Sequence, residues 1–402
     1  MTMILAVLSL LGSLGERPPI EVHGLELPVG DVAASERLYR EAFGFETRFH
    51  GGELARLEKD GVTLLLVASR DLRRGAPGSA VVTMTLETAD LAGATEAAEA
   101  AGFVVEDGSG SPPSVPGRAC TLRDRDGHLT NLIAREPGAD HSPASCRVVR
   151  LGLRVEPGSD LAFLEPLGFE ARTEAELPDA LPFARRGAAE LVVRGSAERA
   201  SGGGATLLLS TERLDPWRDL LAERGFVPRD VLARGAFGGR RLALAVPSRV
   251  PVALVERSAD QRAFERLFDL AGTWEGHSTE GWTARITIEV IARGSAILER
   301  SNFEAHPGET MLSLFHMDQG RLVLQHTCVA GNQPLLEASE ISRETLSFRY
   351  RSGLDLASRD QGHMDAADFR FDGPDAFSSR WSWFQQGRTS WMEEIRYARK
   401  AD

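Results

Sequence analysis

The sequence has few of the features that identify several large classes of protein. Its 402 residues include only three cysteines, Cys120, Cys146 and Cys328, which form no CxxC pair and no disulfide framework. We expect them to be buried or idle thiols. No apolar run reaches the roughly 18 residues that a membrane-spanning helix needs, so no membrane span is expected. The net charge of −12 argues against nucleic acid as a partner, since a polyanion requires a basic face.

The common signatures of catalysis are also missing. There is no P-loop, no glycine fingerprint of a dinucleotide-binding fold, no nucleophile elbow and no HExxH zinc motif. Apolar residues nevertheless make up 42% of the chain. A chain of this length and composition is expected to build roughly two to four packed domains.

The first 19 residues form an apolar leader. Ser13 and Gly15 are small residues at the spacing that a signal peptidase accepts, and Glu16 would begin the mature chain. The basic region that usually opens a signal peptide is absent. Because the first strand is expected near Ile20, the leader has no structural role. We therefore favour export as the expectation, with a cytoplasmic location as the alternative.

Residues 20–257 contain a repeated unit of about fifty residues. In the first copy, a strand with alternating apolar residues covers 20–29 and an amphipathic helix covers 32–43. Asp31 is the expected N-cap of that helix. Strands over 52–59 and 62–68 follow, so the unit is β-α-β-β with a further strand expected.

The same order recurs three times. The second copy has strands over 80–88, 118–123 and 129–135 with a helix over 89–101; the third follows a polar linker over 138–145 with a strand over 148–155 and a short helix over 160–166; the fourth has strands over 205–210, 241–246 and 252–256 with a helix over 214–226.

The pattern changes at Asp260. One short amphipathic helix is followed by strands without any helical period, which is typical of an antiparallel barrel or sandwich. The expected strands cover 282–290, 295–303, 310–317, 321–328, 345–350, 367–371, 377–385 and 390–397.

The strings VHGLELPVGDVAASERLYREAFGFE and RDRDGHLTNLIAREP resemble the vicinal-oxygen-chelate superfamily, which includes glyoxalase I, bleomycin-resistance proteins and extradiol dioxygenases. The resemblance covers residues 20 to 137, and more faintly 148 to 257. It implies βαβββ modules that pair, each pair curling into a half-open cup. The expected fold class is α+β, with one such domain at 20–137, a degenerate second one at 146–257 and an antiparallel β-barrel at 260–400.

In metal-dependent members, His, Gln or Glu side chains on facing strands hold a divalent ion that polarises two substrate oxygens. The resemblance places one ligand seven residues before the aspartate that ends a module's first strand, which gives Gly24 and Thr83; the usual glutamate of the last strand is Asn131. Glycine has no side chain, and threonine and a neutral amide are weak ligands for such ions. We therefore expect no metal and no other cofactor in the two tandem domains.

Two nearby histidines are not expected to replace the missing ligands. Strand alternation should point His23 away from the cup, unless a one-residue bulge turns it inward. His128 lies in a turn and is expected to be solvated. The polar residues expected to line the first cup, as ligand contacts without chemistry, are Glu26, Arg56, Thr85 and Asn131.

The strings LAGTWEGHS, HMDQGRLVLQHTCVAGNQP and SSRWSWFQQGR resemble a family of bacterial lipocalin-like, single-domain β-barrel proteins of unassigned function. The GTWEG opening also resembles the calycin barrels, which include fatty-acid-binding proteins and nitrobindin-like haem binders. The tryptophans expected to plug and cap such a barrel are Trp274, Trp282, Trp381, Trp383 and Trp391.

A polar focus is expected inside this barrel. His326 and Cys328 are two residues apart on one strand, so they share a face, and His316 should lie near His326 across a hairpin. Such a group could bind a haem, a metal or a polar ligand, or it could be a satisfied hydrogen-bond network or an outer face. The candidate ligand-binding residues of the barrel are His316, His326, Cys328, Asn332, Gln333 and His363.

Three kinds of function follow from these expectations. The favoured one is a small-molecule-binding protein with metal-free cups and a barrel pocket. One alternative is an enzyme, either of the glyoxalase or dioxygenase type or assisted by haem or a metal in the barrel. The other is a non-catalytic protein that assembles with copies of itself. The expected partners are a small-molecule ligand and, in the last case, a homo-oligomer.

Overall fold

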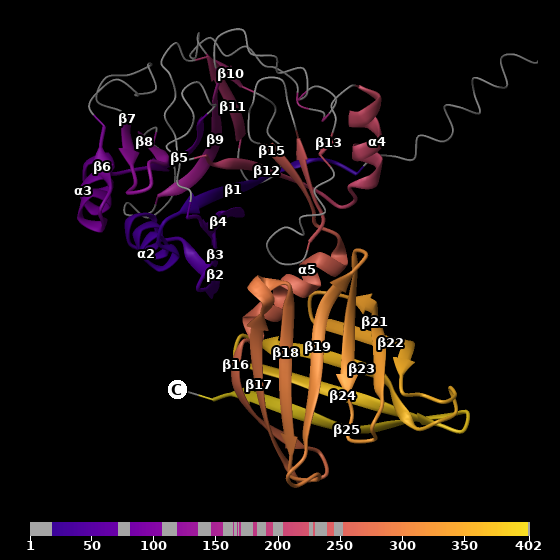
Figure 1. Cartoon of the computed structure of the whole chain (residues 1–402). Helices are drawn as coiled ribbons and strands as arrows, with labels where there is room; N and C mark the ends of the chain where they lie inside the picture. The colour runs from indigo at the N-terminus through magenta and orange to yellow at the C-terminus, as the bar shows by residue number, and fades with distance from the viewer. Residues whose placement is uncertain are drawn as a thin grey trace, which may run out of the picture. The chain divides into compact units, whose positions relative to one another are not determined.

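The computed structural model describes residues 18–70, 81–106, 119–135, 146–155, 164, 167, 169, 180–182, 190–195, 204–224, 228–229, 239–244 and 252–400. Most of the predicted leader, the linker over 138–145 and most of the helix predicted over 160–166 lie outside these residues. The chain divides into two units, Met1–Leu232 with Arg241–Glu256 and Ala233–Arg240 with Arg257–Asp402 (Figure 1). No helix among the described residues has the length and apolar character needed to cross a membrane.

The first unit repeats the predicted module. The first copy contains β1 (Glu21–Val29), α2 (Val32–Phe43), β2 (Glu46–Gly51), β3 (Leu54–Lys59) and β4 (Val62–Ala68); the second contains β5 (Val81–Thr88), α3 (Leu91–Ala101), β6 (Val104–Val105), β7 (Ala119–Arg123) and β8 (Leu129–Ala134); the third contains β9 (Arg147–Val155), β10 (Ala180–Pro182) and β11 (Glu190–Gly195); the fourth contains β12 (Thr206–Thr211), α4 (Asp215–Glu223), β13 (Pro228–Arg229), β14 (Arg241–Leu244) and β15 (Val252–Glu256).

The modules pair differently from the expectation that neighbours in sequence form one cup. β1 runs antiparallel to β12, so the first and fourth modules share an eight-stranded sheet in the order β13-β14-β15-β12-β1-β4-β3-β2. β5 runs antiparallel to β9, so the second and third modules share a seven-stranded sheet in the order β10-β11-β9-β5-β8-β7-β6. The domain bounds predicted from sequence stay a prediction, but each of the two sheets combines modules from both predicted domains.

Local chemistry fixes the first helix as the sequence predicted. The side chain of Asp31 accepts a hydrogen bond from the backbone N–H of Ala34 at 2.9 Å, which satisfies one free amide of the first turn. Gly44 ends the helix in the left-handed region, with φ of 71°, where glycine carries no steric penalty. The buried face of α2 includes Leu38 and Tyr39, which pack into the core of this unit.

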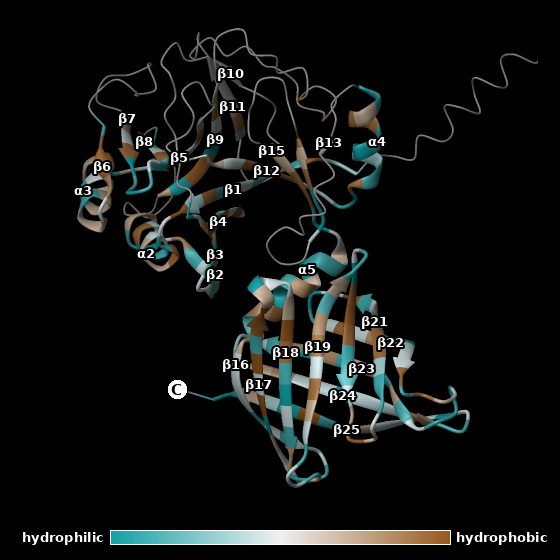
Figure 2. Ribbon diagram, viewed as in Figure 1, coloured by the Kyte–Doolittle hydropathy of each residue, from teal (hydrophilic) through white to brown (hydrophobic). Residues whose placement is uncertain are grey.

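The second unit contains a closed barrel of ten antiparallel strands, in which each strand pairs with the next and β16 pairs with β25. The strands alternate inward and outward residues, and their ribbons carry both hydrophobic and hydrophilic stretches (Figure 2). The strands are β16 (Gly272–Ser278), β17 (Thr283–Ile291), β18 (Ala296–Phe303), β19 (Thr310–Asp318), β20 (Arg321–Thr327), β21 (Gln333–Ile341), β22 (Thr345–Leu354), β23 (His363–Gly373), β24 (Ala376–Gln385) and β25 (Arg388–Arg399).

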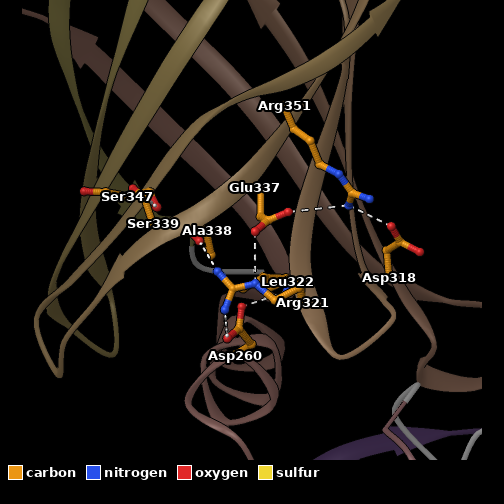
Figure 3. Close-up of polar contacts among 9 residues, drawn as sticks. All are labelled: Asp260, Asp318, Arg321, Leu322, Glu337, Ala338, Ser339, Ser347 and Arg351. Atoms are coloured by element: carbon orange, nitrogen blue, oxygen red, sulfur yellow. Dashed lines mark hydrogen bonds and ion pairs between the residues drawn. The ribbon is translucent and has the colours of Figure 1, made fainter.

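Helix α5 (Ala259–Arg266) packs at one end of this barrel, against β19, β20 and β21 (Figure 1). The buried carboxylate of Asp260 accepts a hydrogen bond from the backbone N–H of Leu322 at 2.9 Å and pairs with Arg321 at 3.0 Å. Arg321 in turn pairs with Glu337 on β21 at 3.0 Å (Figure 3). Charge-assisted hydrogen bonds of this kind hold the helix to the β19–β20 hairpin and to the neighbouring strand.

Trp274 plugs the same end of the barrel. Its side chain is fully buried, and its indole N–H donates to the carbonyl oxygen of Leu270 at 2.8 Å. The guanidinium of Arg399 lies 4.2 Å from the centre of the indole ring and donates to the carbonyl of Asp269 at 2.6 Å. Leu270 and Asp269 belong to the short 3₁₀ helix η2 (Leu267–Leu270). The ring, the arginine and this helix therefore close the barrel beside α5.

Candidate functional site

Backbone and side-chain atoms crowd Gly24 and Thr83, the two positions at which the resemblance places a metal ligand on a module's first strand. A methyl group added at Gly24 would lie 1.8 Å from the carbonyl oxygen of Thr63 on β4. Thr83 is buried on β5 opposite Gly152, where an added methyl group would lie 2.4 Å from the Thr83 hydroxyl. A longer side chain at Gly24 would therefore require the first sheet to rearrange.

His23 lies at the irregularity that the sequence analysis named as its only route into the cup. The register of β1 against β12 shifts between Val22 and Gly24, so simple alternation does not assign the face of the buried His23 side chain. Even so, no group of three His, Cys, Asp or Glu side chains that could hold a metal ion occurs among the residues that the structure describes.

Asn131 belongs to a polar row on the second sheet. Its side-chain oxygen accepts a hydrogen bond from the Thr121 hydroxyl at 3.0 Å, and its backbone pairs with Thr85. Thr85 in turn pairs with Arg150 on β9. Because paired residues of neighbouring strands face the same side, this row joins the second and third modules. Asn131 is thus a hydrogen-bonded member of the sheet surface.

His128 is buried, so the prediction that it is solvated is wrong. Its Nε2 donates to the carbonyl oxygen of Pro28 at 2.8 Å, and its backbone N–H donates to Asp124 at 2.8 Å. Asp124 also accepts a hydrogen bond from the hydroxyl of Tyr39 at 2.9 Å, and burial raises the pKa of its carboxyl group. The turn is therefore tied into the unit through α2 and the end of β1, which a solvated turn would not be.

Glu26 is engaged in an ion pair with Arg241 of β14. Both side chains are about one-fifth exposed. The pair connects the first strand of the first module to the fourth module, in keeping with the module pairing. The charge of Glu26, which was predicted to line the first cup, is therefore already compensated.

The second unit contains a cavity of about 70 Å³ at the barrel end remote from α5. Its deep part is formed by buried residues on β18, β19, β20, β23 and β25, and its mouth by residues next to the loops after β16 and β18. The residues that line it are Trp282, Glu299, Ser301, Phe303, Ala305, His306, Met311, His326, Met364, Trp381, Met392, Glu393, Ile395 and Tyr397.

A hydrogen-bonded chain of polar groups borders this cavity. The Ser301 hydroxyl donates to Glu299 at 2.7 Å, and Ser313 also hydrogen-bonds Glu299. The Ser313 hydroxyl lies 3.1 Å from Nδ1 of His326. Burial raises the pKa of the Glu299 carboxyl group, and these two serine hydroxyls offset part of that shift.

His326 offers one open polar atom. Burial lowers its pKa to about 4, so the ring is neutral at neutral pH. Its Nδ1 contacts Ser313, and its Nε2 has no hydrogen-bond partner. Depending on the tautomer, that nitrogen can accept a hydrogen bond from a molecule in the cavity or donate one to it. The Trp381 ring packs against the imidazole, with 4.8 Å between ring centres.

His316 does not join this group, because the hairpin register differs from the predicted one. Ser313 is the residue opposite His326, whereas His316 lies opposite Val323. The neighbours of His316 on β19, Phe315 and Met317, are buried, and His316 itself is only half-buried. Alternation therefore places His316 on the face opposite to that of Ser313.

Cys328, Asn332 and Gln333 lie at the loop that joins β20 to β21. The backbone N–H of the buried Cys328 donates to the carbonyl of Asn332 at 3.2 Å. The Asn332 side chain donates to the carbonyl of Gly362 at 2.8 Å, which ties this loop to the one before β23. Gln333 begins β21 and is half-buried. These hydrogen bonds hold Cys328 and Asn332 in place within the loop between β20 and β21.

His363 belongs to a separate cluster. It is fully buried, its Nδ1 donates to the carbonyl of Gln361 at 2.6 Å, and its Nε2 contacts Arg359. The Arg359 guanidinium lies between two rings, 4.2 Å from the centre of Tyr350 and 3.9 Å from that of Phe384. No hydrogen bond, ion pair or ring contact in the described barrel joins His326 to Cys328 or His363.

The acidic part of the cavity was not predicted from the sequence. Ile297, Glu299 and Ser301 alternate on β18, and all three are buried. An ionisable residue at an inward-facing position of a barrel strand indicates a polar site, since a buried charge requires hydrogen-bond partners. Applying alternation to whole strands, and not only to the histidines, would have found Glu299.

The family comparison concerns the first unit. Residues 21–132 match the model of the Glyoxalase/Bleomycin resistance protein/Dioxygenase superfamily. Among solved structures, glyoxalase I from Zea mays is 18% identical, with a TM-score of 0.45, over 62% of this chain and 96% of that chain. A variant of homoprotocatechuate 2,3-dioxygenase from B. fuscum is 16% identical, with a TM-score of 0.24, over 61% of this chain and 74% of that chain.

A glyoxalase-related enzyme from Fulvimarina pelagi is 24% identical, with a TM-score of 0.25, over 30% of this chain and 95% of that chain. The search of curated proteins finds no match. Identities and TM-scores this low carry no argument about activity.

Proposed function

We propose, for a chain that carries a domain of the glyoxalase, bleomycin-resistance and dioxygenase superfamily at residues 21–132, that it binds a small molecule in the cavity of its C-terminal barrel. The observation that carries this proposal is the unpartnered Nε2 of His326 at the cavity wall. A buried polar atom without a partner costs about 1–3 kcal/mol, and a ligand that hydrogen-bonds it removes that cost.

The composition of the wall supports the same proposal. Ligand sites are mostly apolar and aromatic, with a few polar groups that fix the orientation of the ligand. Here Met311, Trp381 and Ile395 supply apolar surface, while Glu299 and His326 supply polar atoms close together. The cavity therefore suits a small molecule with an apolar body and one polar group.

The test uses benzyl alcohol, benzylamine and benzoate as probes, titrated into the full-length protein by calorimetry. Met311→Trp fills the cavity and should weaken the binding of any accepted probe at least about tenfold. Leu312→Trp, on the half-exposed outer face of the same strand, should leave binding unchanged. If no probe binds, or if binding survives Met311→Trp, the barrel cavity is not the ligand site.

We further propose that the cups bind no catalytic metal. The support is the lack of ligand side chains at Gly24, Thr83 and Asn131, and the backbone of β4 that fills the space at Gly24. Elemental analysis of the full-length protein should therefore find less than about 0.1 equivalent of any divalent metal. A chelator should leave the unfolding temperature unchanged, and an absorption spectrum would report haem. A stoichiometric metal that remains in the His326→Gln variant would contradict this proposal.

A further inference from the structure

We propose that the ligand of the barrel cavity is a small organic cation, an ammonium group carried on an aromatic or alkyl body. This inference rests on the proposed binding function and names the class of ligand. It follows from the charges of the wall, from the surroundings of Glu299 and from the aromatic residues at the mouth.

The cavity wall carries acidic groups and no permanently basic one. Glu299 and Glu393 line it, and no lysine or arginine is among the lining residues that the structure describes. The two histidines of the wall are His306, half-buried near the mouth, and His326, which is neutral at pH 7. A carboxylate or phosphate ligand would therefore find no basic group to balance its charge, whereas the carboxyl groups of the wall can balance a cation.

Glu299 has no cation of its own. Its side chain is buried, and its hydrogen-bond partners are the neutral hydroxyls of Ser301 and Ser313. Burial raises the pKa of the Tyr397 phenol on β25, and the nearby Glu299 adds to this rise. No ion pair to Glu299 occurs within the described barrel. Burial disfavours the ionised form of this carboxyl group, and a cation that reaches it would stabilise that form.

An ammonium group matches the acceptors in this part of the cavity. It has three N–H donors and no acceptor. The carboxyl oxygens of Glu299 and the open Nε2 of His326 can accept from it, and the Ser313 hydroxyl bridges these two residues. The half-buried Glu393 lies on the same wall and adds negative charge.

The mouth offers a surface for the body of the ligand. Trp282 and Phe303 pack edge to face with 5.7 Å between ring centres, and both are half-exposed. Benzene occupies a cavity of about 150 Å³ in a protein core, so the 70 Å³ of this cavity holds the head group and leaves a ring at the mouth.

The probes of matched shape separate the alternatives by charge. At pH 7.5, benzylamine is a cation, benzyl alcohol is neutral and benzoate is an anion. Calorimetry on the full-length protein should give a dissociation constant for benzylamine at least about tenfold below that of benzyl alcohol, and no measurable binding of benzoate.

Glu299→Gln keeps the shape of the side chain and removes the carboxyl group that can ionise to balance a bound cation. It should weaken benzylamine binding at least about tenfold while leaving benzyl alcohol within about threefold of the unmodified protein. The matched control is Glu394→Gln, which removes a carboxylate from the outer face of β25, where Glu394 pairs with Arg396. This control should leave all three affinities unchanged.

The inference is overturned if benzyl alcohol or benzoate binds the unmodified protein as tightly as benzylamine does. That result needs no variant, so it stands even if Glu299→Gln fails to fold. An unchanged preference for benzylamine in a folded Glu299→Gln protein also overturns it. If the neutral or anionic probe binds best and Met311→Trp abolishes that binding, the binding function holds and only the charge of the ligand is wrong.

Discussion

Replacing Trp274 by alanine is expected to lower the free energy of unfolding of the barrel by about 3–5 kcal/mol, the range for a large aromatic residue removed from a core. The side chain is fully buried and packs edge to face on Phe377, with 4.8 Å between ring centres. Its loss would also remove the hydrogen bond to Leu270 and the surface on which Arg399 lies. The consequence is an open barrel end beside α5.

The measurement is denaturant unfolding of the full-length chain followed by tryptophan fluorescence. Trp217 is the only one of the six tryptophans that lies before the barrel, so a Trp217→Phe background makes the signal specific to the barrel. Trp274→Phe, which keeps a ring but loses the indole N–H, should cost less than the alanine variant. Trp391→Ala removes the same residue type from a position that is 39% exposed and should cost about 1 kcal/mol or less. An equal loss of unfolding free energy in Trp274→Ala and Trp391→Ala would contradict the role of Trp274 in closing the barrel end.

Local elements were predictable because their signals are local. The helix predicted over 32–43 is α2 with the same bounds, since Asp31 and Gly44 specify its two ends through short-range hydrogen bonds and a positive φ. The barrel was predictable as a succession of strands. β16 and β21 were missed, because Gly272 and Gly276 interrupt the apolar pattern of the first and Pro334 is the second residue of the other.

The pairing of modules was not predictable from such signals. β1 meets β12 through pairs such as Glu26 with Thr206, which are separated by most of the first unit. The alternating pattern of a strand with one buried face does not specify whether the strand pairs with the next module or with a distant one. The choice depends on long-range packing that no single segment encodes.

The candidate site shows the same limit. His326 was found because alternation along one strand is a local rule, and it lies in the cavity wall. His316 was misplaced because its partner depends on the register of the β19–β20 hairpin, where Asp318 pairs with Arg321. Ser313 and Glu299 reach His326 across two neighbouring strands, so their contribution appears only when strand order and register are known.

The buried His326 should make the barrel lose stability as the pH falls below neutrality. Its pKa is about 4 in the folded barrel, against about 6.5 in an unfolded chain. Between these values the unfolded state binds a proton and the native state does not, so stability is fully present above about pH 6.5 and declines towards pH 4. The shift corresponds to roughly 3 kcal/mol across that window. Glu299 contributes to the pH dependence in the opposite direction, since burial raises its pKa and protonation at low pH then favours the native state.

His326→Gln isolates the histidine contribution, because glutamine retains hydrogen-bonding groups and does not titrate. Unfolding free energies of the full-length chain at pH 7.5 and 4.5 should differ by about 2–3 kcal/mol more in the unmodified protein than in the variant. His316→Gln, on the opposite face of the hairpin, should behave like the unmodified protein. Parallel curves for His326→Gln and the unmodified protein would mean that the native imidazole is solvated. A solvated imidazole has water on its Nε2, so the same result would remove the open acceptor on which the ligand site depends.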